Sequence, residues 1–219
     1  MRRFAPPPKK KGTRIAQDDA LWKPPGAKGV GYHQDAAYIS DQFLPRDDNS
    51  VTIWIALDDA DADTGVVEYA RGSHRWFDQA IHTTAESSFH GGGDPRAPAR
   101  VAAAAADEAF EVVAVEVPTG AAVFHHQDVW HGSGSNSTAD RPRRALALHM
   151  IRRDVEFRTE PAPDYIYGAN TNTNTNTNTN TNTNTNTNTL RPHVQINFRK
   201  LGTVAPLRRG DGAVCCAVL

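Results

Sequence analysis

The chain has 219 residues, of which 39% are hydrophobic and 22% are charged, and its formal net charge is −1. This length is sufficient for one domain of ordinary size with a buried core. The nearly balanced charge gives no general field that would attract nucleic acid or an anionic membrane, so we expect neither as a partner.

Residues 1–27 are rich in proline, lysine and arginine, and they include the run Pro6-Pro7-Pro8. This composition is typical of an extended and poorly ordered segment. The arginine-rich start leaves an organelle transit peptide as an alternative, but Asp18 and Asp19 occur early and no amphipathic pattern is clear. We therefore predict an N-terminal segment outside the folded core.

From residue 28 to 168 the pattern indicates one domain of short apolar strands separated by clusters of turn-forming residues. Residues 77–108 form a long excursion in which we expect one helix. Many short strands with long loops favour an all-β core, as in a sandwich or jelly roll, over a parallel α/β sheet. The strands are expected at residues 30–34, 51–57, 66–70, 110–117, 121–125 and 144–152.

Residues 169–189 contain ten Asn-Thr dipeptides in succession. Such a tract has no apolar side chains to bury and cannot offset the entropy lost on ordering, so we expect a disordered insertion. The tail, 190–219, ends in Cys216-Ala-Val-Leu219, which fits a prenylation box, and a lipid anchor at Cys216 is kept as the alternative to a chance match.

No apolar run is long enough to span a bilayer, so stable membrane insertion is not expected. The two cysteines are adjacent and suggest no disulfide framework. Together with the lack of a secretory signal pattern, these features favour an intracellular, cytoplasmic location.

The first motif that carries chemistry is His33-Gln34-Asp35, directly after an expected strand. A histidine and a carboxylate two residues apart point to the same side of an extended chain. Together with His131, far downstream, they would supply two imidazoles and one carboxylate, a ligand set that leaves open positions and suits Fe(II). Zn(II) would tolerate the same ligands and remains an alternative. The tripeptide pattern recurs at 126–128, but no suitable histidine follows that copy.

The second feature is a basic stretch that opens the strand after His131, with arginines at 141, 143 and 144. A guanidinium here could clamp a dicarboxylate through paired, charge-assisted hydrogen bonds. Strand alternation places Arg143 and Ala145 on one face and Arg144 on the other.

These blocks together resemble the phytanoyl-CoA dioxygenase family of 2-oxoglutarate oxygenases, from about Trp22 to Gly168. The family implies a double-stranded β-helix, which is a cupin-like jelly roll with a few peripheral helices, holding Fe(II) and using 2-oxoglutarate and O2 as cosubstrates. The resemblance rests on Gly31-Tyr-His-Gln-Asp-Ala-Ala-Tyr38, Val51-Thr-Ile-Trp-Ile-Ala-Leu-Asp-Asp-Ala60, Thr64-Gly65, Gly72-Ser-His74, Val117-Pro-Thr-Gly120, Trp130-His-Gly-Ser-Gly-Ser-Asn136, Pro142-Arg-Arg-Ala-Leu-Ala-Leu-His149 and Tyr165-Ile-Tyr-Gly168.

By this resemblance, the iron ligands are His33, Asp35 and His131. Arg143 would bind the distal carboxylate of 2-oxoglutarate with Ser133 assisting, and Gln34 would contact the cosubstrate or orient a ligand. The loop after His131 is one residue longer than the commonest family spacing, which leaves Arg141 and Arg144 as alternatives to Arg143. Trp54 and Tyr69 are expected in the core, and His125 and His149 in the core or in support of the ligands.

The family implies a dioxygenase that hydroxylates an unactivated C–H bond of a small-molecule or acyl substrate and releases succinate and CO2. The alternative is a catalytically inactive or truncated jelly-roll module with a binding role. Family members usually have a substantial N-terminal part, of which only about 30 residues precede His33, and the Asn-Thr tract falls where the family continues its closing elements.

Overall fold

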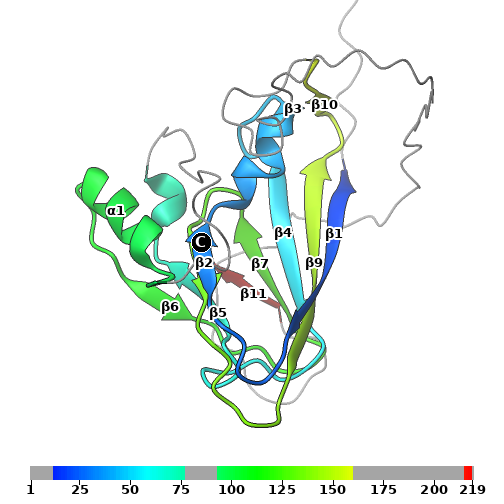
Figure 1. The fold of residues 1–219 in the computed structure, drawn as a ribbon. Helices are drawn as coiled ribbons and strands as arrows, with labels where there is room; N and C mark the ends of the chain where they lie inside the picture. The colour runs from blue at the N-terminus through cyan, green and yellow to red at the C-terminus, as the bar shows by residue number, and fades with distance from the viewer. Residues whose placement is uncertain (1–11, 77–92, 160–214, 219) are drawn as a thin grey trace, which may run out of the picture.

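The computed structural model describes residues 12–76, 93–159 and 215–218. Two β-sheets face each other across a packed core, and the one α-helix among these residues lies on the outer side of the smaller sheet (Figure 1). All strand pairs are antiparallel except the pair β7 and β11. The expected all-β core, a double-stranded β-helix of the jelly-roll type, is thereby confirmed.

The larger sheet has the strand order β1-β9-β4-β7-β11 and the smaller sheet the order β2-β8-β5-β6. The larger sheet consists of β1 (Thr13–Lys23), β9 (Arg143–Arg152), β4 (Ser50–Ala56), β7 (Ala122–His126) and β11 (Cys215–Val218). The smaller sheet consists of β2 (Val30–His33), β8 (His131–Ser133), β5 (Val67–Ala70) and β6 (Val112–Ala114). A two-stranded pair of β3 (Phe43–Leu44) and β10 (Glu156–Phe157) and the short 3-10 helices η1 (Asp35–Ala37), η2 (Ser40–Gln42) and η3 (Ser73–Arg75) complete the described elements, besides α1.

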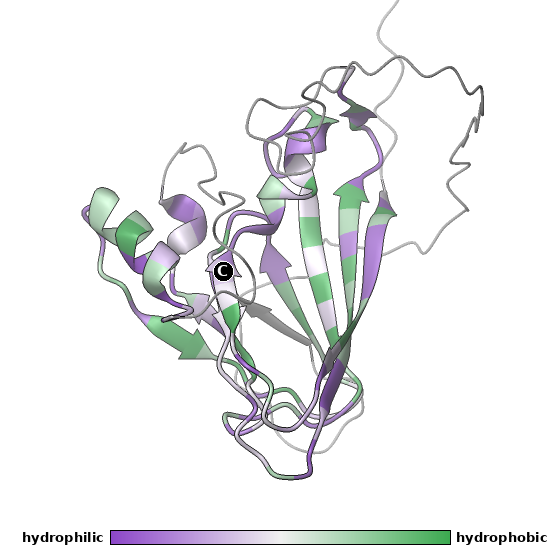
Figure 2. Cartoon of the chain, viewed as in Figure 1, coloured by the Kyte–Doolittle hydropathy of each residue, from purple (hydrophilic) through white to green (hydrophobic). Residues whose placement is uncertain are grey.

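Strand β4 shows how the sequence pattern builds the core. Its β-branched and aromatic residues favour an extended chain, and hydrophobic bands alternate with paler ones along it in Figure 2. Thr52 and Trp54 are both buried and line the cavity between the sheets, whereas Ile55 on the other face is only half-buried. Trp54 packs with Tyr69 of β5 in the main apolar cluster, which joins the two sheets.

The N-terminal segment departs from its expectation. Residues 13–23 are extended, as predicted, but they are not poorly ordered, because they form β1 and pair with β9 along their whole length. Alanine and aspartate favour strands weakly, so the pairing with β9 rather than local propensity holds this strand. Residues 1–11 lie outside the described residues.

Helix α1 (Ala97–Ala105) is the helix expected within the excursion 77–108. Proline in its first turn suits a helix start, and Ala99 and Ala103, one turn apart, are fully buried. They pack against Ala70 of β5 and Trp76, which fixes the helix to the smaller sheet. Residues 77–92 lie outside the described residues.

The predicted disordered insertion at 169–189 also lies outside the described residues, as does all of the tail 190–219 except β11. The backbone of β11 pairs in parallel with β7, from Cys215 opposite Ala122 to Val218 opposite His125. This pairing gives no support to a lipid anchor at Cys216. Within the described residues, no helix is long and apolar enough to cross a membrane.

Candidate metal centre

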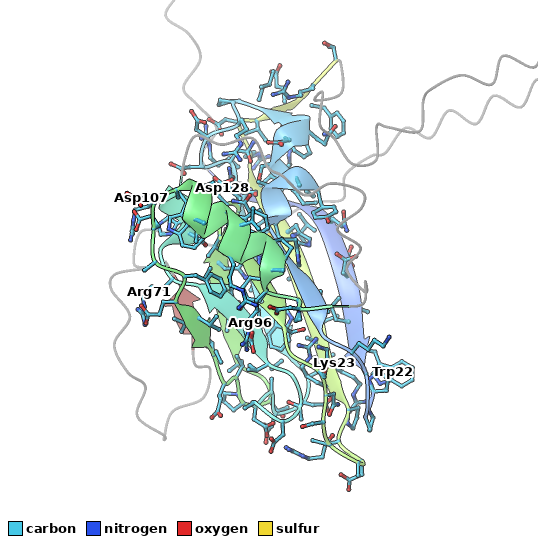
Figure 3. All side chains as sticks on the ribbon, turned by 60° about the vertical axis from the view of Figure 1, so that its left-hand side comes forward. Trp22, Lys23, Arg71, Arg96, Asp107 and Asp128 are labelled. Atoms are coloured by element: carbon cyan, nitrogen blue, oxygen red, sulfur yellow. The ribbon has the colours of Figure 1, made fainter. Side chains whose placement is uncertain are left out.

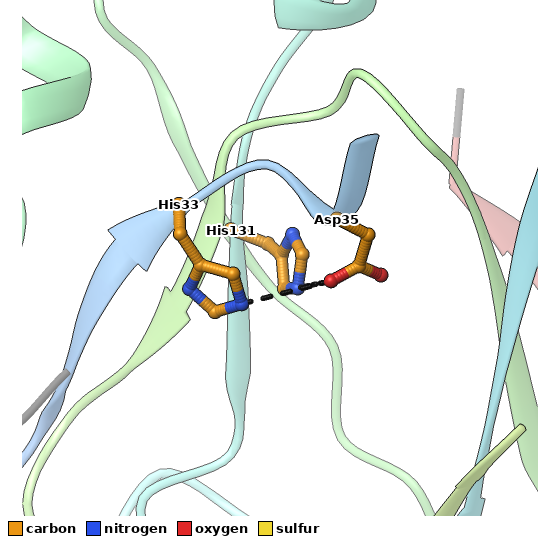
Figure 4. A group of neighbouring side chains, drawn as sticks. All are labelled: His33, Asp35 and His131. Carbon is orange, nitrogen blue, oxygen red and sulfur yellow. Dashed lines mark ion pairs between the residues drawn. The ribbon is translucent and has the colours of Figure 1, made fainter. Parts of the chain in front are cut away.

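Three side chains from adjacent elements meet at one end of the cavity. His33 ends β2, Asp35 begins η1, and His131 begins β8 directly opposite His33 in the strand register. Gln34 between the first two is extended, with φ −120° and ψ 131°, so His33 and Asp35 project to the same side as predicted. The ligand atoms of the three residues all lie within 4.8 Å of one another (Figure 4).

The hydrogen bonds of the two imidazoles determine which nitrogen is available to a metal. His33 Nδ1 lies 2.9 Å from the Gly31 carbonyl oxygen, and His131 Nδ1 lies 3.0 Å from that of Val129. A carbonyl can only accept, so each Nδ1 carries the proton and each Nε2 presents a lone pair. These Nε2 atoms lie 3.7 and 3.5 Å from Asp35 Oδ1, an arrangement that fits a cation among them.

Burial keeps both imidazoles in the neutral form that binds metals. It lowers the pKa of His33 to about 4, with a further contribution from the neighbouring His131. It also lowers the pKa of His131 to about 4, although Asp35 opposes the shift. At neutral pH neither ring has to lose a proton before its lone pair can be donated.

The second oxygen of Asp35 is fully engaged by neighbouring donors. His125 Nε2 donates to Asp35 Oδ2 over 2.9 Å, and the Thr52 hydroxyl donates to the same oxygen. Tyr69 Oη lies 3.2 Å from His125 Nδ1 and supports the ring from behind. Burial alone raises the pKa of Asp35, but His131 and the hydrogen bond from His125 outweigh it and hold that pKa well below its usual value. His149 lies 3.6 Å from the same oxygen.

The second His-x-Asp copy has a different environment. His126 Nε2 lies 3.0 Å from Asp48, and Asp128 receives Nη1 of Arg46 over 2.9 Å. Within residues 12–76 and 93–159, only His33, Asp35 and His131 form a group of three or more possible metal ligands. Identical spacing therefore gives two possible metal ligands in one place and surface and loop contacts in the other.

A cavity of about 350 Å³ connects this cluster with Arg143. Arg143 is only 5% exposed, donates through Nη1 to the Gly65 carbonyl over 2.7 Å, and lies 5.3 Å above the Trp54 ring. Its Nε has no hydrogen-bond partner among the described residues. Burial lowers the pKa of Arg143 to about 10, so it still carries its charge at neutral pH.

The alternative arginines point elsewhere. Arg141 is exposed and pairs with Asp61 over 2.7 Å, and Arg144 is exposed and pairs with Asp58 over 2.7 Å. Alternation along β9 therefore leaves Arg143 as the basic residue of this stretch that lines the cavity.

Ser133 and Gln34 lie in different surroundings. Ser133 is buried and lines the cavity, and its hydroxyl accepts a hydrogen bond from Lys23, which lies opposite Arg143 in the strand register. Gln34 is also buried, but its amide donates to the Asp128 carbonyl over 2.6 Å and its side chain does not line the cavity. This hydrogen bond connects the loop that leads to His131 with the segment that carries His33 and Asp35.

Sequence reasoning missed the contribution of β1. Gln17 and Asp19 line the cavity wall, and Lys23 at the end of the strand donates to Ser133 Oγ over 2.7 Å. The composition of this polar, proline-flanked stretch did not indicate an ordered strand. The one signal that could have located it was alternation, which puts residues 17, 19, 21 and 23 on one face of an extended segment.

Known proteins resemble this chain in sequence and in fold. The sequence matches the family described as phytanoyl-CoA dioxygenase (PhyH) over residues 2–145. One similar solved structure is SnoK, a non-heme alpha ketoglutarate dependent carbocyclase from nogalamycin biosynthesis, with 24% identity and a TM-score of 0.52, covering 68% of this chain and 54% of that one. Another is the epimerase SnoN in complex with Fe3+, alpha ketoglutarate and nogalamycin RO, with 22% identity and a TM-score of 0.52.

The match to SnoN covers 76% of this chain and 59% of that one, so the chain spans little more than half the length of these two structures. At these identities the two structures support the fold. The family match extends over the N-terminal strand, all three members of the His-Asp-His cluster and Arg143. The chain therefore belongs to the phytanoyl-CoA dioxygenase family.

Proposed function

We propose that this chain is an Fe(II)- and 2-oxoglutarate-dependent dioxygenase that hydroxylates a C–H bond of a small-molecule or acyl substrate. The observation that carries the proposal is the His33, Asp35 and His131 cluster, in which both unprotonated Nε2 atoms lie within 3.7 Å of Asp35 Oδ1 in a cavity that Arg143 also lines. Two imidazoles and one carboxylate leave open positions on an octahedral metal, which the chemistry of a 2-oxo acid and O2 requires.

In this proposal the chain holds the ligands in place before metal binds. The carbonyls of Gly31 and Val129 fix the two rings in the tautomer that ligates. His125 and the Thr52 hydroxyl hold Oδ2 of Asp35 and leave Oδ1 for the metal. Such partners of ligands set ligand orientation and basicity, so the site needs little rearrangement.

Arg143 and Ser133 would bind the distal carboxylate of 2-oxoglutarate. A buried guanidinium with an unpartnered Nε can offer charge-assisted hydrogen bonds to a carboxylate. Bound iron and 2-oxoglutarate would supply the oxidising chemistry, in which one oxygen atom of O2 enters the product and the other enters succinate as CO2 is released.

The cavity size bears on the substrate. A volume of about 350 Å³ lies at the lower end for small-molecule sites, and it has to accept the cosubstrate together with the reacting group. The cavity wall is apolar at Leu21, Val30 and Val67, and it is polar at Gln17 and Asp19 of β1. We infer that only the reacting part of the substrate enters this cavity.

The test is succinate formation by anaerobically purified, Fe(II)-loaded protein that receives 2-oxoglutarate and then O2. A His131→Ala variant removes a proposed ligand, and His126→Ala serves as the matched control because that histidine belongs to the other His-x-Asp copy. We expect succinate from the wild type and the control but not from His131→Ala.

Two other outcomes would contradict the proposal. Folded, iron-loaded wild type that forms no succinate would favour the inactive binding module. Activity that depends on Zn(II) and not on 2-oxoglutarate would favour a metalloenzyme of another class. Metal content measured beside succinate separates these two outcomes.

A further inference from the structure

Two buried cations stand side by side at the Arg143 end of the cavity. Lys23 and Arg143 are opposite each other in the register of β1 and β9, and they are 4% and 5% exposed. The residue before Lys23, Trp22, is 72% exposed and projects away from the ribbon (Figure 3). Strand alternation therefore turns Lys23 inward beside Arg143.

Neither cation forms an ion pair with a carboxylate among the described residues. Lys23 donates to Ser133 Oγ and to the Gly134 carbonyl, and Arg143 donates to the Gly65 carbonyl. Glu68 attracts Lys23, but its carboxylate already receives two bonds from Arg96, at 2.7 and 2.8 Å. Buried charges are normally paired, so two unpaired cations at one cavity end indicate an anion site.

The hydrogen-bond directions connect Lys23 to the cavity. An ammonium group can only donate, so Ser133 Oγ accepts from Lys23 and its own proton is left to donate elsewhere. Among the described residues, none accepts a hydrogen bond from Ser133 Oγ, and Ser133 lines the cavity while Lys23 does not. The hydrogen bond from Lys23 therefore leaves the Ser133 hydroxyl as a donor for a ligand bound at the Arg143 end of the cavity.

We propose that Lys23 is a positioning residue that acts through Ser133 and makes the Arg143 end of the cavity selective for a 2-oxo acid with a second, distal carboxylate. This inference rests on the proposed function, because it assigns a further residue to the cosubstrate of that reaction. Arg143 provides direct contact, whereas Lys23 supplies a second positive charge and orients one hydroxyl.

The test compares binding of two cosubstrates to anaerobic Co(II)-loaded protein by titration calorimetry, which needs no turnover. 2-Oxoglutarate carries the distal carboxylate, and 2-oxopentanoate has a methyl group in its place. Lys23→Met should lower the affinity for 2-oxoglutarate about 10- to 100-fold, which is the range for loss of one hydrogen bond to a charged group. It should leave 2-oxopentanoate binding within about threefold, because that analogue has no charge for Lys23 to recognise.

The exposed Lys28, five residues away, provides the matched control, and Lys28→Met should bind both compounds like the wild type. Ser133→Ala and the double variant Lys23→Met/Ser133→Ala test the connection. If Lys23 acts through Ser133, the double variant loses much less affinity than the product of the two single losses. Lys23→Gln keeps a donor without the charge and provides a second variant if Lys23→Met does not fold.

Each result decides one question. If the wild type binds Co(II) but not 2-oxoglutarate, the proposed function fails and this inference fails with it. If the wild type binds 2-oxoglutarate and neither Lys23 variant changes its affinity, the inference alone is wrong. Equal weakening of both cosubstrates would give Lys23 a merely structural role and would also overturn it.

Discussion

The two ends of the cavity are prepared for ligands of opposite charge. At one end, His33, Asp35 and His131 present lone pairs and a negative charge, with every other polar atom of the three groups held by a partner. At the other end, Arg143 and the protonated form of Lys23 present positive charges whose hydrogen-bond partners are neutral oxygens. The first end therefore suits a cation and the second suits an anion.

This difference shows why the two ends should respond separately to substitution. Among the described residues, no lysine or arginine pairs with Asp35 and no carboxylate pairs with Lys23 or Arg143, so each end should be stabilised by a ligand of opposite charge. The metal end draws its order from β2, η1 and β8, whereas the anion end depends on β1 and β9. Substitutions at one end should therefore change affinity for one ligand and spare the other.

The largest effect is expected for Asp35→Asn, which keeps the shape and a side-chain oxygen but removes the only negative charge among the ligands. We expect Co(II) affinity to fall about a thousandfold, because breaking a buried charge pair costs several kcal/mol. Visible absorption of the bound Co(II) measures this affinity. Asp48→Asn, at the exposed partner of His126, is the control. Wild-type affinity in Asp35→Asn would mean that the metal binds elsewhere.

The next effect tests the anion end. Arg143→Met should lower 2-oxoglutarate affinity about a hundredfold, since it removes one partner of a buried, charge-assisted contact. Co(II) affinity should not change. Arg144→Met removes an exposed arginine on the opposite face and should change neither affinity by more than about fivefold. Equal losses of 2-oxoglutarate affinity in the two variants would contradict the placement of the cosubstrate contact on the Arg143 face of β9.

A smaller effect is expected behind the metal ligands. Thr52→Val has nearly the same volume but removes the hydroxyl that donates to Asp35 Oδ2. Because loss of such a partner weakens metal binding about 10- to 100-fold, we expect a drop near tenfold in Co(II) affinity. 2-Oxoglutarate affinity of the fully metal-loaded protein should stay close to that of the wild type. A selective loss of cosubstrate affinity would place Thr52 in the anion end instead.

The sequence brought together the residues of the proposed metal site more completely than those of the proposed anion site. His33 and Asp35 are two residues apart on one short segment, so a local pattern places both, and His131 follows within a recognisable block. Alternation also selects Arg143 over Arg144. Alternation along the segment 33–35 also turns the side chain of Gln34 away from those of His33 and Asp35, and in the structure its amide donates to the Asp128 carbonyl.

Lys23 was not predictable in this way. Its position depends on pairing between β1 and β9, which are separated by more than a hundred residues. The residues of β1 include several that favour strands weakly, such as Asp18, Asp19 and Ala20, so local propensity argued against order. Only the tertiary pairing turns a polar segment into the wall of the cavity.

The smallest predicted effect is the pH dependence of 2-oxoglutarate binding. Burial, and then the charge of Arg143, lower the pKa of Lys23 to about 7, while Glu68 opposes the shift. A dianion binds the protonated form better, so affinity should be highest below pH 7 and should decrease as Lys23 loses its proton. Linkage gives a decrease of about fivefold between pH 7 and 8 for the metal-loaded protein.

The histidine ligands do not share this range, since the pKa values of His33 and His131 are about 4. Titration calorimetry of 2-oxoglutarate at pH 6, 7 and 8, repeated with Lys23→Met, measures the effect. The variant should bind weakly and with little change over this range, because the group that loses a proton is gone. If the affinity of the variant for 2-oxoglutarate decreases with pH as in the wild type, another group is titrating. The charge of Lys23 would then not contribute to cosubstrate binding.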